Sequence, residues 1–98
     1  MYRIIEDTIA PLFGVTPEDI RDISPHNTRD VLDARHFIWF VLHEVLGYRS
    51  VVIASEYGVT KRNINHYISD FSDGLRCQPF YANNYRRILS ALKEKDII

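Results

Sequence analysis

Apolar residues recur at helical intervals along most of the chain, most clearly over residues 30–46. The positions there that follow the i, i+3, i+4, i+7 rule are Val31, Ala34, Ile38, Val41, Leu42 and Val45. Phe37, Trp39 and Phe40 extend the apolar surface almost all round this segment. Because a helix that is apolar on most sides lies in the middle of its domain, we expect 30–46 to form a central helix that ends at Gly47.

Start and stop signals place two shorter helices in front of the central one. Residues 2–13 predict a first helix, with Pro11 distorting its last turn and Gly14 ending it. Thr16, followed by a proline and two acids, is typical of a helix N-cap. It predicts a short second helix that ends near Ile23.

Behind the central helix the pattern predicts two helices separated by a tight turn. Ser50 is a capping residue for a short helix over 51–57. Gly58 stands where the chain must turn and is expected to have a positive φ. Thr60 is a capping residue for the next helix, predicted over 61–71.

The end of the chain is predicted to hold a loop and a last helix. Residues 72–78, with Gly74, are typical of a loop, and the last helix is expected from Pro79 or Phe80 to about Lys95. No segment keeps the strict alternation of a strand. The pattern therefore predicts an all-α bundle of about six helices.

Composition limits the possible classes of protein. The 98 residues, 46% of them hydrophobic, suit one domain spanning 1–98 with a core of its own. No apolar run approaches the roughly 18 residues of a membrane-spanning helix. Two acids within the first seven residues argue against a signal peptide. The single cysteine cannot form an internal disulfide. We therefore expect a cytoplasmic protein that does not enter a membrane.

The charge is distributed unevenly although the net charge is only −1. Residues 1–33 carry three arginines against seven acids, whereas residues 34–69 carry four basic residues against two acids. The front of the chain is thus acidic and the rest mildly basic. This asymmetry permits a local basic face.

The segment from Val52 to Ile68 resembles a helix-turn-helix. Ala54 is small enough for a close helix crossing, and Gly58 and Val59 occupy the turn. The expected inward face of the second helix consists of Ile64, Tyr67, Ile68 and Phe71. The remaining polar stripe consists of Arg62, Asn65, His66 and Ser69.

That stripe carries the side chains that read DNA in a major groove. An arginine can donate two hydrogen bonds to guanine, and an asparagine can pair with adenine. Thr60 and Lys61 stand at the helix N-terminus, where backbone N–H groups favour a phosphate. The alternative interpretation is a helical hairpin whose polar face is merely solvated.

A wider resemblance is to the DNA-binding C-terminal domain of the bacterial replication initiator DnaA. The matching stretches are Val15–Ile20, Thr28–Asp30, Ala34–Leu42, Ser50–Gly58 and Phe80–Leu92. The resemblance implies a Trp-repressor-like helical fold that binds duplex DNA. The run Thr60–Asn65 departs from the family's arginine-aspartate-histidine-threonine-threonine run, so the target sequence stays open. The chain has no Gly-rich nucleotide-binding loop.

The resemblance also implies a contact set beyond the stripe. Arg29 would approach the minor groove or backbone, residues near Ser50 would touch phosphate, and the residues after Gly58 would enter the major groove. The predicted DNA-binding residues are Arg29, Arg35, Arg49, Ser50, Thr60, Lys61, Arg62, Asn63, Asn65, His66 and Ser69. Arg35 has an alternative role tied to the core.

Two other function classes compete with DNA binding. The four histidines are candidate bases, and His36 and His43, seven residues apart, could share a metal. However, no Ser/His/Asp or Cys/His order stands out, so we predict no enzyme, metal or cofactor. The second competitor is a protein-interaction module or a homodimer, in which aromatic residues of the central helix stay exposed. We favour their burial in the core.

Overall fold

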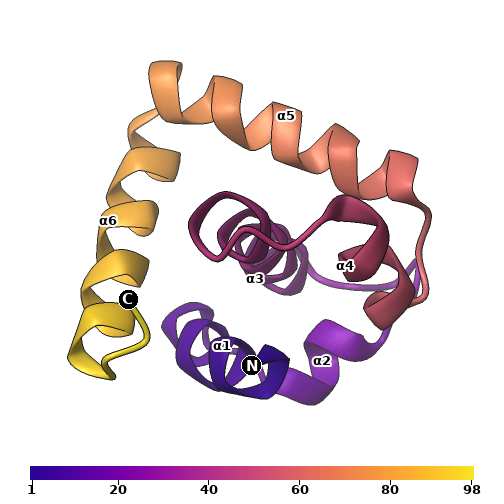
Figure 1. The fold of residues 1–98 in the computed structure, drawn as a ribbon, viewed down its shortest axis with the longest axis horizontal. Helices are drawn as coiled ribbons and strands as arrows, with labels where there is room; N and C mark the ends of the chain where they lie inside the picture. Colours follow the sequence, from indigo (N-terminus) through magenta and orange to yellow (C-terminus); the bar gives the residue numbers. More distant parts are fainter.

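The computed structural model describes residues 1–98 and contains helices and turns only. The elements in chain order are α1 (Tyr2–Ile9), the 3₁₀ helix η1 (Ala10–Phe13), α2 (Pro17–Arg21), α3 (Arg29–Phe40), the π-helical segment η2 (Val41–Val45), α4 (Ser50–Tyr57), α5 (Lys61–Cys77) and α6 (Pro79–Glu94). Figure 1 shows the other helices arranged around α3. The predicted all-α bundle of six α-helices is confirmed.

The core is centred on α3. Its three aromatic residues Phe37, Trp39 and Phe40 are all buried, which confirms the predicted core position rather than an exposed aromatic surface. Phe37 meets Phe71 of α5 edge to face at 4.4 Å between ring centroids. Phe40 meets Tyr85 of α6 in the same way at 5.5 Å. The central helix thus connects α5 to α6 through aromatic pairs.

The first helices follow their local signals. Helix α1 ends at Ile9, and the proline-containing turn η1 follows, ending at Gly14 with φ of 72°. Thr16 caps α2: its hydroxyl accepts the Asp19 N–H at 3.2 Å, and the Asp19 carboxylate accepts the Thr16 N–H at 3.1 Å. This reciprocal capping stabilises a helix of only five residues.

The predicted central helix 30–46 is divided in two. It begins at Arg29, and its last turns, Val41–Val45, form a π-helix. Gly47 follows with φ of 76°, in the left-handed region that glycine adopts without strain.

The predicted loop over 72–78 is wrong, because α5 continues to Cys77. Gly74 is a buried helical residue rather than a turn residue. A Cβ built on it would lie 2.6 Å from the Cδ2 atom of Tyr81 on α6. Gly74 therefore allows the two helices to pack closely, and the chain turns at Gln78, just before Pro79 begins α6.

None of the helices combines the length and the apolar composition needed to cross a lipid bilayer.

Candidate nucleic-acid interface

Helices α4 and α5 are joined by a short turn and pack against each other. Gly58 ends α4 with φ of 69°, which confirms the predicted positive φ. The Val59 N–H donates to the Ala54 carbonyl at 3.0 Å. Thr60 caps α5, because its hydroxyl accepts the Asn63 N–H at 3.1 Å. The local signals thus build a helix–turn–helix unit.

Helix α5 has a buried and an exposed face. Its buried residues are Ile64, Ile68, Phe71 and Gly74. The exposed polar residues along its first half are Lys61, Arg62, Asn65, His66 and Ser69. The structure therefore brings the predicted stripe together on one solvent-facing side of the helix.

The basic side chains at this unit are free of ion pairs. Arg49, Lys61 and Arg62 are exposed, and no carboxylate lies within salt-bridge distance of them. In the acidic front, by contrast, Arg3 and Arg21 each contact two carboxylates. The cations available to an anionic partner thus include the three at α4 and α5.

A shallow depression of about 290 Å³ lies at the start of α5. Its lining residues are Thr60, Arg62, Asn63 and His66. The depression adjoins the positive end of the helix dipole, where backbone N–H groups also face outward. This arrangement favours an anionic oxygen.

The acidic residue Asp70 limits the basic face toward the middle of α5. Its carboxylate lies 3.3 Å from the Nε2 atom of His66, one turn earlier. Ser69 is exposed beside Asp70. The region suited to an anion therefore covers the first two turns of the helix, and Ser69 lies at its margin.

Ser50 does not cap α4. The N-cap is Arg49, in an extended conformation, and Ser50 is the first helical residue. The Ser50 side chain is 8% exposed, and its hydroxyl donates to Oδ1 of Asn65 at 2.6 Å. The predicted phosphate contact of Ser50 is replaced by a contact between α4 and α5.

The two arginines of α3 lie in different surroundings. Arg29 is exposed and pairs with Asp33 at 3.3 Å. Arg35 is only 3% exposed and donates to the carbonyls of Ile20 and Asp22, both at 2.9 Å. Arg35 thus has the alternative role, tied to the core, in place of a phosphate contact, because its guanidinium satisfies the C-terminal carbonyls of α2.

Sequence reasoning missed a buried polar cluster under α4. Glu6 of α1 is 1% exposed, and its Oε2 atom accepts from Arg21 Nε at 2.5 Å and from the Tyr57 hydroxyl at 2.6 Å. Arg21 also donates to the Glu56 carboxylate at 2.7 Å. The spacing of Glu6 from Tyr2 and Ile9, on the inner face of α1, is the signal that could have predicted it.

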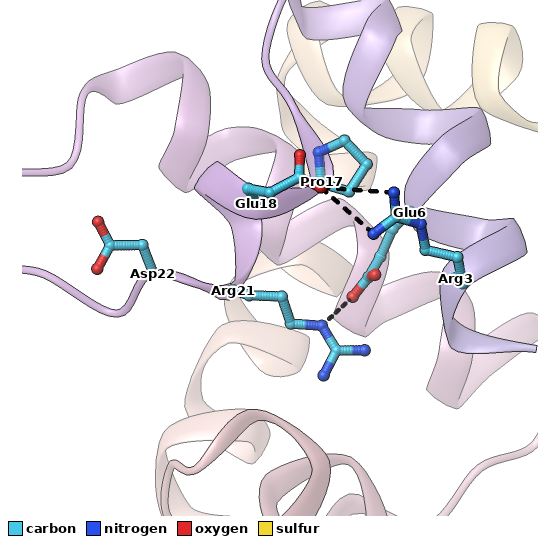
Figure 2. A pocket seen from close by; sticks show the side chains of 6 residues that line it. All are labelled: Arg3, Glu6, Pro17, Glu18, Arg21 and Asp22. Atoms are coloured by element: carbon cyan, nitrogen blue, oxygen red, sulfur yellow. Dashed lines mark hydrogen bonds and ion pairs between the residues drawn. The ribbon is translucent and has the colours of Figure 1, made fainter.

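Figure 2 shows the pocket beside this cluster. Its volume is about 520 Å³, and its lining residues are Arg3, Glu6, Pro17, Glu18, Arg21 and Asp22. Arg3 reaches Glu18 at 3.4 Å, and Arg21 reaches Glu6. Because these cations are already paired, the cluster ties α1, α2 and α4 together and leaves no unpaired cation for a ligand.

Two of the four histidines have roles in packing. The His36 ring stacks on Tyr67 with 3.6 Å between centroids, and the His43 Nδ1 atom lies 2.9 Å from the Tyr48 carbonyl oxygen. Burial, reinforced by Arg35 and Arg29, lowers the pKa of His36 to about 3. No three His, Cys, Asp or Glu side chains gather in a metal-binding group.

No protein-family model, curated protein or solved structure matches this chain.

Proposed function

We propose that this protein binds duplex DNA through the α4–α5 helix–turn–helix, with the first two turns of α5 in the major groove. The supporting observation is the exposed stripe of α5, which combines unpaired cations with an asparagine and a histidine. A solvated helix face usually mixes its cations with acids, whereas no acid precedes Asp70 in this helix. The resemblance to the DnaA DNA-binding domain leads to the same proposal.

The side chains divide into two roles in this proposal. Arg62 and Asn65 lie one turn apart and face solvent, so they are placed to read base edges. Lys61, at the first turn of α5, and Arg49, at the N-cap of α4, hold phosphates. Arg29 reaches the flanking backbone from α3. We propose that such binding takes place in the cytoplasm and serves replication, transcriptional control or a mobile element.

The salt dependence of binding to labelled duplex DNA tests this proposal. For the wild type, the logarithm of the binding constant should fall linearly with the logarithm of salt concentration. The Lys61→Ala/Arg62→Ala variant should bind more weakly. Its salt slope should be shallower by about 0.9 for each phosphate that the variant no longer neutralises. Arg62→Ala alone should cost about 1–3 kcal/mol on the selected site if it reads a base.

The matched control is Lys93→Ala/Lys95→Ala. These lysines lie at the C-terminal end of α6, are exposed, and form no ion pair. The control removes the same charge from another part of the surface. Equal weakening in both double variants, or no binding by the wild type at low salt, would overturn the proposal.

Association with another protein chain is the second candidate function. It is favoured by Val51 and Val52 on α4, which are 50% and 47% exposed and adjacent. Sedimentation of the free protein tests it. A concentration-dependent mass that Val51→Ser/Val52→Ser abolishes would support association through this face, and a monomer at all concentrations would oppose self-association.

A further inference from the structure

We propose that Ser50 fixes the amide orientation of Asn65, so that Asn65 presents its NH₂ group to DNA and selects guanine over adenine. The inference rests on the proposed function and deepens it. In this inference Ser50, a buried residue of α4, positions Asn65 of α5 and thereby determines which base Asn65 prefers.

A hydrogen bond joins the side chains of Ser50 on α4 and Asn65 on α5. The Ser50 hydroxyl lies 2.6 Å from Asn65 Oδ1, and the Ser50 side chain is almost fully buried. Asn65 is exposed and makes no other side-chain hydrogen bond. The amide thus has its oxygen turned toward α4 and its nitrogen unengaged.

The Ser50 hydroxyl disfavours reversal of the Asn65 amide. In the structure the Ser50 hydroxyl donates to one acceptor, Asn65 Oδ1. With the amide reversed, its NH₂ group would face the hydroxyl oxygen, and the buried proton would be left without an acceptor. An unsatisfied buried donor is more costly than an average hydrogen bond is stabilising, so the observed orientation is preferred.

The orientation of the Asn65 amide affects which base it can bind. An asparagine that pairs with adenine in the major groove accepts from N6 and donates to N7. With Oδ1 turned toward Ser50 on α4, the edge of the Asn65 amide that remains for a base is its NH₂ group. In the major groove guanine offers two acceptors, O6 and N7. Adenine offers only the N7 acceptor, and its N6 amino group, a donor, would face the donating NH₂ group of Asn65. The fixed amide therefore favours guanine.

Selection from a randomised duplex library tests the inference. For the wild type we expect one base pair at which guanine is preferred over adenine on the order of tenfold. In Asn65→Ala this preference should disappear, and the rest of the selected site should be retained. In Ser50→Ala the freed amide should accept adenine at the same base pair. Ser50→Thr keeps the hydroxyl and should keep guanine.

A measurement without DNA checks the positioning itself. The side-chain ¹⁵N–¹H₂ resonances of Asn65 should show an ordered amide in the wild type and a mobile one in Ser50→Ala, with the backbone resonances of α5 unchanged. An equally mobile amide in both proteins would overturn the inference.

The outcomes of the selection also separate this inference from the proposed function. A wild type that selects a site with adenine at the Asn65-dependent pair overturns the inference and leaves DNA binding in place. Selection of identical DNA sites by the wild type and by Ser50→Ala also overturns the inference and leaves DNA binding in place. A wild type that enriches no sequence and binds no duplex at low salt overturns both.

Discussion

Replacing Gly74 with alanine tests the closest contact between α5 and α6. Two effects oppose each other. Alanine is more favourable than glycine inside a helix by about 1 kcal/mol. The new methyl group, however, would lie 2.6, 2.8 and 2.9 Å from three ring carbons of Tyr81. Because carbon atoms pack at about 3.5–4.0 Å, the ring would have to withdraw by roughly 1 Å.

Two aromatic rings lie beside the Tyr81 ring. Phe71 meets it edge to face at 4.8 Å between centroids, and Phe80 lies 5.4 Å away. Overpacking of this kind costs about 1–3 kcal/mol, and three simultaneous clashes place this site at the upper end. The net effect of Gly74→Ala is then a destabilisation of about 2 kcal/mol, from which the helix-propensity gain is already subtracted.

Chemical and thermal unfolding followed by circular dichroism measure this destabilisation. A decrease of about 2 kcal/mol lowers Tm by roughly 10 °C in a domain of this size. The control is the same substitution in a Tyr81→Ala background. There the clash is absent, and Gly74→Ala should stabilise by about 1 kcal/mol. A higher Tm for Gly74→Ala with Tyr81 present would refute the reasoning.

Three further substitutions have expected outcomes. Arg35→Met removes the donors that satisfy the α2 carbonyls and should cost about 3 kcal/mol in urea unfolding; the exposed Arg87→Met should change stability by less than about 1 kcal/mol. Glu6→Ala leaves Arg21 and the Tyr57 hydroxyl without their shared acceptor and should cost about 3 kcal/mol, whereas Tyr57→Phe should cost about 1 kcal/mol; equal costs would contradict the shared role of Glu6. His36 has a folded-state pKa of about 3 and an unfolded value of 6.5, so the unfolded state binds its proton first. The contribution of His36 to the free energy of unfolding should therefore be fully present above pH 6.5. It should be lost as the pH drops toward about 3, by at most about 1.4 kcal/mol per pH unit. His36→Phe keeps the stacking on Tyr67 and should remove this part of the pH dependence; an unchanged pH profile would be evidence against a buried neutral His36.

The helices near the front of the chain and at the turn were predictable because their signals are local. Thr16 and Thr60 bond N–H groups three residues away in the same helix. Gly14 and Gly58 take positive φ, which depends on the residue itself. The stripe on α5 was predictable for a similar reason, since helical spacing alone places Arg62, Asn65 and His66 on one side.

The wrong predictions have a common physical cause. Gly74 was interpreted from its neighbours in the sequence, and the phosphate contacts of Ser50 and Arg35 were predicted without knowledge of the elements that pack against them. The structure gives each of them a partner on another element: the Tyr81 ring, the Asn65 amide and the carbonyls that end α2.

Residue type and helical spacing were enough to establish an all-α bundle, the start of most of its helices and the polar side of α5. Those properties depend on interactions within one helix. The packing of the helices against one another decided which polar side chains remain available to a partner. Arg35 and Ser50 are committed to the fold, whereas Arg49, Lys61 and Arg62 are free. The physical reason is that the packing of the helices decides which polar groups are buried against protein partners and which still face solvent.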